Sequence, residues 1–153
     1  MLIKLATLKD ADIVFDITQQ TIDAVYPSYY PAGAVDFFKK HHSRERIEKD
    51  IENKIVFLCV TDDEIVGTVT IRDNEILRLF VSPQHQKKGY GRELLDFAEN
   101  KIREEYSEIV IDASLPAKSI YLKRGYKEIS YNKILTDNGD YLCYDVMVKE
   151  CVK

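Results

Sequence analysis

The feature that most constrains the fold is a set of three consecutive strand-like segments in the middle of the chain. Residues 55–61, 64–72 and 75–81 are rich in Val, Ile, Leu and Thr, and two polar dipeptides separate them. Connections as short as these join antiparallel neighbours. The segments therefore predict a three-stranded antiparallel meander, which commits the chain to a core built on a sheet.

The segments on either side of the meander show helical and strand-like patterns. A capping box from Thr7 to Asp10 precedes a helical stripe of apolar residues, and Asn138-Gly139 is typical of a hairpin turn. The elements expected before the meander are a strand over residues 2–6 and helices over 8–25, 34–41 and 44–53. Those expected after it are a helix over 90–105, a strand over 108–112, a helix over 116–124, and strands over 126–135 and 141–149.

This order, β-α-α-β-β-β-α-β-α-β-β, predicts an α/β (α+β) fold with a single mixed sheet. We expect about seven mostly antiparallel strands with helices on both faces. The strand over 108–112 is almost wholly apolar, which indicates burial on both faces. A length of 153 residues corresponds to one domain, so residues 1–153 are expected to form a single domain.

Composition narrows the class of partner. The net charge of -4 disfavours general binding to nucleic acid. No apolar run approaches the roughly 20 residues of a membrane span, and the first residues lack the pattern of a secretory signal. The three cysteines are far apart and lack CxxC spacing, so neither a disulfide framework nor a metal site is expected. These observations favour a cytoplasmic protein with no nucleic-acid, membrane or metal partner.

A glycine-lysine loop, Gln86-Lys-Lys-Gly-Tyr-Gly91, lies between the meander and the helix over 90–105. It lacks the Lys-Ser/Thr pair of a nucleotide-triphosphate loop, and Leu94 stands where a dinucleotide fingerprint requires its third glycine. A pyrophosphate loop is a third reading, because a helix start offers free N–H groups and glycines let the backbone approach a ligand. The alternative is a solvated basic turn, and the six residues alone do not decide between them.

The residues around this loop form two longer motifs. The stretch from Glu75 to Leu95 contains a strand ending in Val-Ser-Pro, then Gln-x-x-Gly-x-Gly, then a helix with Leu-Leu. Residues 117–126 read Ala-x-x-x-Tyr-x-x-x-Gly-Tyr. These motifs, and the order of the elements, resemble the GNAT superfamily of acyl-CoA-dependent N-acetyltransferases. The resemblance covers essentially the whole chain and is least close over residues 20–53.

The resemblance implies a site for acetyl-CoA. In this family a bulge splays the central strand from its parallel neighbour, here the strand over 108–112, and the cofactor lies in the gap. The pantetheine arm binds the backbone at the end of the central strand, and the pyrophosphate binds the glycine loop. The cofactor-binding residues implied are Leu79, Phe80, Val81, Gln86, Lys87, Lys88, Gly89, Tyr90, Gly91, Arg92, Ser114, Ala117 and Tyr121. Ser114 departs from the family, since many members carry Asn there.

The resemblance also implies catalytic roles. The N–H of Val81 would polarise the thioester carbonyl, and Tyr121 would act as the general acid for the leaving thiolate. Glu75 begins the central strand, where some members carry a catalytic glutamate that deprotonates the amine. Alternation along a regular strand would place Glu75, Leu77, Leu79 and Val81 on one face. The alternative bases are His41, His42 and His85.

The family recognises its acceptor partly through the loop between its two N-terminal helices. Here that loop contains Tyr26, Tyr29 and Tyr30, which would form an aromatic wall for an amine, with local packing as the alternative. The function implied is acetyl transfer to a primary amine of a small molecule by direct attack in a ternary complex. A protein lysine or N-terminal acetyltransferase and a non-catalytic acyl-CoA-binding module stay open. So do the acyl-chain preference and a homodimer.

Overall fold

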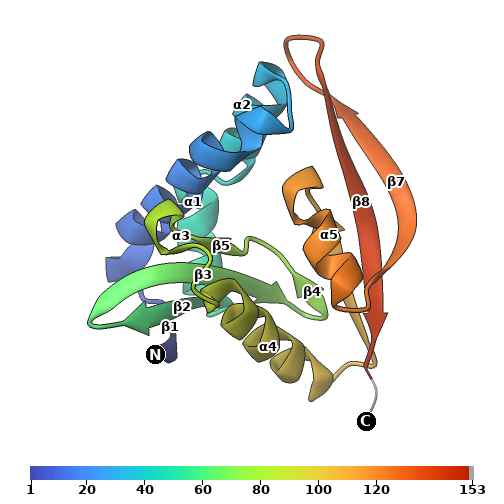
Figure 1. Ribbon diagram of the computed structural model, residues 1–153. Coiled ribbons are helices and arrows are strands. Elements are labelled where there is room, and N and C mark those ends of the chain that lie inside the picture. The colour runs from blue at the N-terminus through green and yellow to red at the C-terminus, as the bar shows by residue number, and fades with distance from the viewer. Residues whose placement is uncertain (152–153) are drawn as a thin grey trace.

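The computed structural model describes residues 1–151 as strands and helices joined by short turns (Figure 1). The strands are β1 (Leu2–Leu5), β2 (Val56–Thr61), β3 (Glu64–Arg72), β4 (Glu75–Ile76), β5 (Phe80–Val81), β6 (Glu108–Ala113), β7 (Lys127–Leu135) and β8 (Tyr141–Glu150). The helices are α1 (Ala11–Val25), α2 (Ala32–His41), α3 (Arg44–Glu52), α4 (Tyr90–Arg103) and α5 (Leu115–Lys123), with 3-10 turns η1 (Leu8–Asp10), η2 (Tyr26–Ser28) and η3 (Pro83–His85). Within residues 1–151, no helix is both long and apolar enough to cross a membrane.

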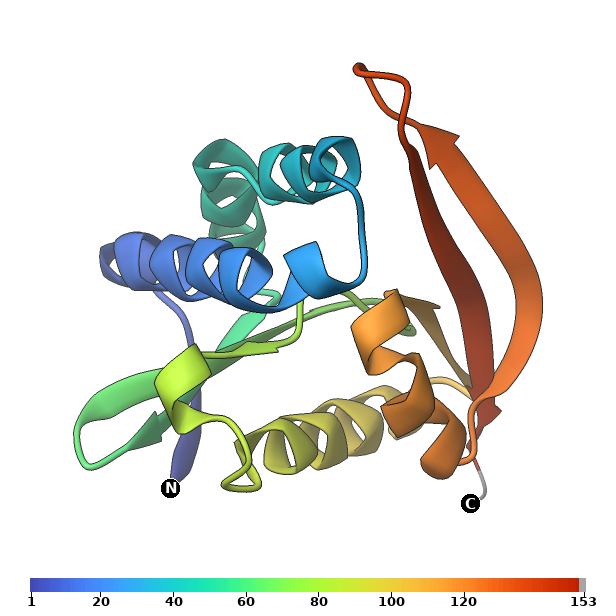
Figure 2. The same cartoon turned by 45° about the horizontal axis from the view of Figure 1, so that its top comes forward.

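The strands form one mixed sheet in the order β1-β2-β3-β4-β6-β8-β7, and β5 pairs with β3 beside this path. β4 and β6 run parallel, whereas the other neighbours run antiparallel. Figure 2 shows α1, α2 and α3 on one side of the sheet and α4 on the other. The predicted fold class is therefore confirmed. The third strand of the meander is not continuous, because it is divided into β4 and β5.

The division of the central strand is a shift in register against β3. Ile76 of β4 lies opposite Ile71. Five residues later, Val81 of β5 lies opposite Gly67, which is only four residues back along β3. The central strand therefore contains one residue more than its partner over the same length, and this is the definition of a β-bulge.

Thr70 of β3 bonds to both residues of the bulge. Its carbonyl accepts the N–H of Leu77 at 2.8 Å, and its own N–H donates to the carbonyl of Arg78 at 3.2 Å. A bulge bends its strand and increases the local twist. Beyond the two residue pairs that join β4 to β6, the chain turns toward β3, and the two halves of the sheet diverge (Figure 1). The bulge and the splayed parallel pair that the family resemblance implied are thus present.

Three apolar clusters hold the elements in place. The largest lies between the sheet and α4, to which α4 contributes Leu94, Leu95, Ala98 and Ile102. A second, rich in aromatic rings, lies where α1 and α2 meet β5 and β8. A third packs α1 and α3 against β2. The second cluster and the third therefore hold α1, α2 and α3 over the open end of the sheet, where α2 also reaches β8 of the other half.

A buried ionic clamp joins α4, α5 and β8. The carboxylate of Glu99 on α4 is 2% exposed, and it accepts from Arg124 at 2.7 Å and from Lys149 of β8 at 2.8 Å. Arg124 follows α5 and also contacts Asp96 at 2.7 Å. The clamp fixes α5 against α4 and β8.

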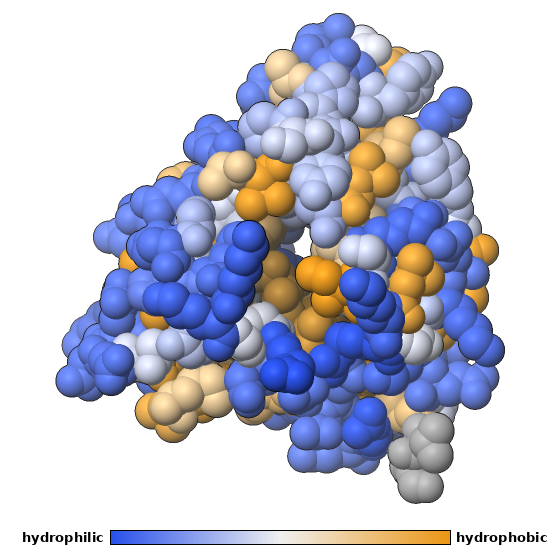
Figure 3. Space-filling model, in the orientation of Figure 1, coloured by the Kyte–Doolittle hydropathy of each residue, from blue (hydrophilic) through white to orange (hydrophobic). Residues whose placement is uncertain are grey.

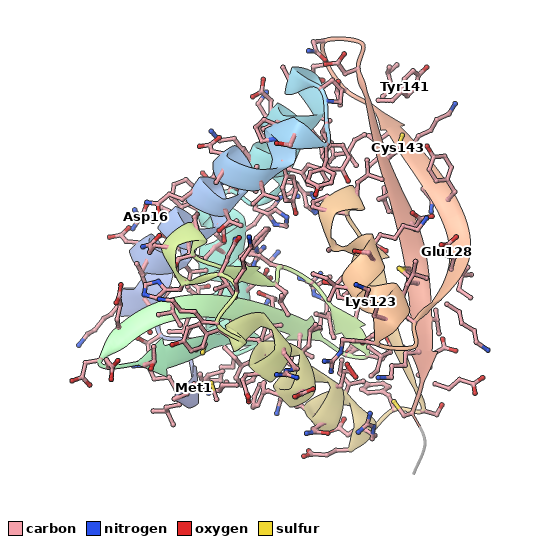
Figure 4. All side chains as sticks on the ribbon, viewed as in Figure 1. Met1, Asp16, Lys123, Glu128, Tyr141 and Cys143 are labelled. Atoms are coloured by element: carbon pink, nitrogen blue, oxygen red, sulfur yellow. The ribbon has the colours of Figure 1, made fainter. Side chains whose placement is uncertain are left out.

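The hairpin of β7 and β8 extends away from the sheet and returns to α2 at its tip (Figure 2). The N–H of Gly33, in the first turn of α2, donates to the Asp140 carboxylate at 2.8 Å. A Cβ at Gly33 would overlap the side chain of Asn138 in the turn. Glycine is therefore required for this close approach. In Figure 4, Tyr141 lies on the outer side of the hairpin, facing away from the gap.

Candidate active site

A cleft of about 1320 Å³ occupies the gap between the diverging halves of the sheet. Its walls come from β5 and the glycine loop, the start of α4, the strand β6, the helix α5, and the ends of α1, α2 and α3. In Figure 3 it is an apolar depression near the centre of the molecule, with a hydrophilic rim. Segments that lie far apart in the sequence thus meet at one site.

The bulge changes which way the residues of the central strand point. Ile76 and Val81 both pack in the cluster on the α4 side, although five positions separate them. In a regular strand an odd separation would place them on opposite faces. Glu75, the neighbour of Ile76, therefore faces away from Val81. The prediction that Glu75 and Val81 share one face is wrong, because the extra residue of the bulge inverts the alternation.

The backbone of Val81 faces the cleft. The next residue, Ser82, donates its N–H to the carbonyl of Val66 in β3 at 2.9 Å. Because residues that bond across an antiparallel pair alternate, the N–H of Val81 points away from β3 and into the gap. Its carbonyl accepts from Thr21 at 3.2 Å and from the side-chain amide of Gln86 at 3.1 Å. Gln86 thus ties the glycine loop to the end of β5.

The two glycines of the loop serve different purposes. Gly89 is the N-cap of α4 and has φ of 92°, in the left-handed region that favours glycine. Gly91 lies inside the first turn, where a Cβ would meet only the side chain of Val81, at 3.8 Å. No described part of the protein therefore requires glycine at position 91. The space in front of it is open, and the free N–H groups of the helix start face that space.

Positive charge lies on the cleft side of the loop. Lys87 and Arg92 line the cleft, together with Tyr90. Lys88 is exposed, and it is not among the described residues that line the cleft. The structure thus brings together most of the predicted loop residues and leaves Lys88 at the rim.

The helix α5 supplies Tyr121 and Ala117 to the opposite wall. Tyr121 is 6% exposed, and its ring lies edge-on to Tyr126 with 5.6 Å between centroids. Burial raises the pKa of Tyr121 above its ordinary value, so the phenol stays protonated at neutral pH and can donate a proton. Ser114, the N-cap of α5, also lines the cleft, and its hydroxyl lies 3.5 Å from that of Tyr26.

The three tyrosines predicted for the acceptor site have different surroundings. Tyr26 is buried and lines the cleft. Tyr30 is buried, and its hydroxyl accepts the N–H of Leu115 at 2.7 Å and donates to the carbonyl of Cys143 at 3.1 Å. It thereby joins α5 to the hairpin strand that carries Cys143 (Figure 4). Tyr29 is 52% exposed and lies outside the described cleft wall.

Two carboxylates, Glu75 and Asp112, lie on the face of the sheet opposite α4. The parallel register places Glu75 beside Val110, so Asp112 follows two residues later on the same face. Burial, and then the nearby Asp112, raises the pKa of Glu75, and burial raises the pKa of Asp112. Of the two, Asp112 lines the cleft. Asp112 was not among the predicted catalytic residues, although a carboxylate in a largely apolar strand was a usable signal.

The histidines proposed as alternative bases make specific contacts. The Nδ1 atom of His42 accepts from the Nε of Arg78 at 3.2 Å. Burial, and then Arg78, lowers the pKa of His42 well below its ordinary value. His42 is therefore neutral with its proton on Nε2, and the residue lines the cleft. His41 likewise meets a guanidinium at Nδ1 at 2.8 Å. His85 bonds to the hydroxyl of Ser82 at 2.7 Å, which closes the turn after β5.

Arg78 is a site residue that sequence reasoning missed. It is 7% exposed, and its guanidinium donates to Asp50 at 3.1 Å and to Thr70 at 3.2 Å. Asp50 is also bonded to Arg72, at 3.0 Å. Asp50 lies 28 positions before Arg78, on α3, so no local pattern links the two residues.

The comparisons with known proteins agree with this geometry. A family model described as an acetyltransferase (GNAT) domain matches residues 23–140. The chain belongs to the GNAT acetyltransferase family. A comparison with curated proteins finds no match. The predicted family is confirmed, and with it the enzyme class, N-acetyltransferase, and the acetyl donor that this class uses, acetyl-CoA.

Solved structures of GNAT proteins share the fold. The GCN5-related N-acetyltransferase from Rhodopseudomonas palustris matches with a TM-score of 0.89 and 18% identity, over 97% of this chain and 94% of that one. PaiA N-acetyltransferase from Thermoplasma acidophilum, in complex with coenzyme A, matches with a TM-score of 0.74 and 21% identity, over 97% of this chain and 98% of that one. A GNAT acetyltransferase from Bacillus cereus matches with a TM-score of 0.67 and 18% identity, over 99% of this chain and 98% of that one.

Proposed function

We propose that this GNAT protein transfers the acetyl group of acetyl-CoA to a primary amine of a small molecule, by direct attack in a ternary complex. The observation that carries the proposal is the opening of the sheet at the bulge. One cleft there joins the glycine loop, the backbone of Val81 and the side chain of Tyr121. A backbone donor beside a buried phenol is the pair of groups that acyl transfer from a thioester needs.

The residues of the cleft fit coenzyme A. The space before Gly91 would be reduced by any Cβ, and it adjoins the positive end of α4. Lys87 and Arg92 add charge suited to a pyrophosphate. The cleft-facing edge of β5 offers backbone groups to the amides of a pantetheine arm. When bound, acetyl-CoA supplies a thioester carbonyl and a thiolate leaving group.

Each catalytic group, whether from the backbone or from a side chain, then has a separate task. The N–H of Val81 polarises the thioester carbonyl, and Tyr121 gives its proton to the departing sulfur. Only the neutral form of an amine attacks, so the acceptor must lose a proton. We assign that task to the carboxylates of Asp112 and Glu75, whose raised pKa values make them better bases than free carboxylates. His42 orients the acceptor as a donor.

The test of this function is turnover of a panel of amines and peptides with acetyl-CoA. Release of the free CoA thiol measures the reaction, and the rise in melting temperature with acetyl-CoA measures binding. We expect stabilisation by acetyl-CoA and turnover of at least one small amine. Stabilisation without turnover would instead indicate a binding module, and turnover of peptides alone would indicate a protein acetyltransferase. No stabilisation would contradict the assignment of the cleft.

Tyr121→Phe separates catalysis from packing at the same site. The variant should lower kcat by about 100-fold, the usual contribution of a general acid, while the Kd for acetyl-CoA stays within about twofold. The matched control is Tyr126→Phe, because Tyr126 packs against Tyr121 and lies outside the described cleft wall. It should retain activity. An equal loss of binding and turnover in Tyr121→Phe would mean that Tyr121 serves packing alone.

A further inference from the structure

The part of the cleft formed by α3 and the bulge carries an excess of positive charge. Four cations line it, and Asp50 is the single carboxylate among them in the described wall. The cations of this basic cluster are Arg46, Lys49, Arg72 and Arg78. The whole chain has a net charge of -4, so the excess belongs to this site and not to the protein at large.

The charge of the basic cluster is only partly balanced within the protein, by Asp50 and by Glu75, which is paired with Arg72 in the strand register. Asp50 gives one oxygen to Arg72 at 3.0 Å and the other to Arg78 at 3.1 Å, so one negative charge serves two positive ones. The side chain of Arg78 is 5% exposed. Burial lowers its pKa, which reflects the cost of holding this charge away from water. A bound anion would offset that cost.

Arg46, another cation of the basic cluster, is bonded to a neutral side chain. Arg46 donates to Nδ1 of His41 at 2.8 Å, and this contact requires that nitrogen to be unprotonated. The pKa of His41 is lowered by burial first and then by Arg46. His42 lines the cleft beside Arg78, and its Nε2 N–H is a further donor of this residue. Guanidinium groups beside an N–H donor form a geometry that suits a carboxylate.

The wall across the cleft contains one carboxylate, although Lys123 and Arg124 at the end of α5 also line the cleft. Asp112 of β6 lines it, and Glu75 lies on the same face of the sheet. The carboxylate of Asp112 acts on the pKa of His41, so it lies within electrostatic reach of α2. The site therefore has the basic cluster on one side and a single carboxylate, Asp112 of β6, on the other.

We propose that the acceptor is an amine that also carries a carboxylate, an amino acid or a close relative of one. Its carboxylate binds Arg46 and Arg78, and its amine lies toward Asp112. This inference rests on the proposed function and narrows its acceptor. A polyamine or an aminoglycoside, which carries only positive charge, would meet four cations at short range and be repelled.

The experiment compares matched acceptors. Each amino acid of a panel is assayed beside its carboxamide and its decarboxylated amine, with acetyl-CoA saturating. For the preferred amino acid we expect kcat/KM to exceed that of both analogues by about 10- to 100-fold, the effect of one hydrogen bond to a charged group. Calorimetry of the same ligands on the protein saturated with CoA supplies a readout without turnover, and it should show the same order.

Variants of the basic cluster test which of its residues binds the carboxylate of the acceptor. Arg46→Gln should raise KM for the amino acid about 10-fold while KM for the carboxamide and the Kd for acetyl-CoA stay unchanged. The matched control is Arg44→Gln, on the same helix, because Arg44 pairs with Glu48 at 2.8 Å and is not among the described lining residues. It should behave as the unchanged protein does.

Equal or better turnover of the decarboxylated amines would overturn the inference and keep the proposed function. Turnover of peptides alone would overturn both, because it would indicate a protein acetyltransferase. Binding of acetyl-CoA with neither binding nor turnover of any amino acid would also overturn the inference. Failure to bind acetyl-CoA would overturn the proposed function itself, so the two results are distinguishable.

Discussion

At the scale of single residues, Gly89 and Gly91 should respond differently to substitution. Gly89→Ala places a Cβ in the left-handed region, which costs about 1–2 kcal/mol of folding stability. Gly91→Val has no such strain, but its side chain would occupy the space before α4. We expect Gly91→Val to raise the Kd for acetyl-CoA about 100-fold with little change in stability, because the lost contacts include charge-assisted bonds. Isothermal titration and urea unfolding measure the two quantities.

The raised pKa of Asp112 predicts opposite effects on activity and stability. Burial favours the protonated carboxyl in the folded state, so its contribution to stability is present at low pH and is lost as pH rises through the raised pKa. Asp112→Asn should therefore raise the melting temperature at pH 7. It should also lower kcat by about 10- to 100-fold, and the remaining activity should lose part of its rise with pH. A lower melting temperature at pH 7 would contradict the assignment.

The residues of the site differed in how far the sequence could predict them. The glycine loop and Tyr121 belong to short motifs, and the resemblance of those motifs to the GNAT family identified them, since the loop residues alone could not. Arg78 and Asp50 form a pair only because α3 packs beside the bulge, and their spacing carries no signal. Tyr30 was predicted to bind the acceptor, but its hydroxyl is bonded to the backbone of α5 and β8 and so holds these two elements together.

At the scale of elements, the Glu99 clamp should determine how firmly α5 is held. Glu99→Gln leaves Arg124 and Lys149 without their shared carboxylate. We expect a loss of about 3 kcal/mol in the free energy of unfolding, as is usual when one partner of a buried ion pair is removed. Urea unfolding measures this loss. The control is Glu104→Gln at the exposed end of α4, which should change stability by less than about 0.5 kcal/mol.

The elements themselves were predicted well, and the bulge shows where the prediction reached its limit. Helical and strand periodicity located the elements because each buries one face. The central strand appeared continuous, because Leu77 and Leu79 are apolar and give no sign of a register shift. The bulge was expected from family resemblance alone. Its effect on Glu75 was missed, since one extra residue reverses every side chain on one side of it.

At the scale of the whole molecule, the contact between Gly33 and the hairpin tip should control the acceptor side of the cleft. Gly33→Ala would displace Asn138, whose side-chain oxygen accepts from Thr136 at 2.7 Å within the turn. We expect faster hydrogen exchange in the tip and a KM for the acceptor raised about threefold or more, with the Kd for acetyl-CoA unchanged. Asp36→Ala, at an exposed position of α2, is the control and should leave both unchanged.

The overall architecture followed from the sequence because its short connections allow few topologies. The charge of the basic cluster could not be predicted from the sequence, because it depends on which cations of α3, β3 and the bulge come together in the fold. An aromatic wall of Tyr26, Tyr29 and Tyr30 was expected for the amine, whereas among the described cleft residues only Tyr26 of these three is present, together with the basic cluster.

The narrow junction between the halves of the sheet has a consequence for motion. Two residue pairs between β4 and β6 are the direct link from one half to the other along the path of the sheet. Beyond them, in the described part of the chain, the facing edges of β5 and β6 have no strand between them, and the opening is spanned by the bonds of Tyr30 and of Gly33 to the other half. A ligand whose amides bond to the edge of β5 would act as a wedge that sets the opening angle. Binding of the first substrate would then shape the space offered to the second.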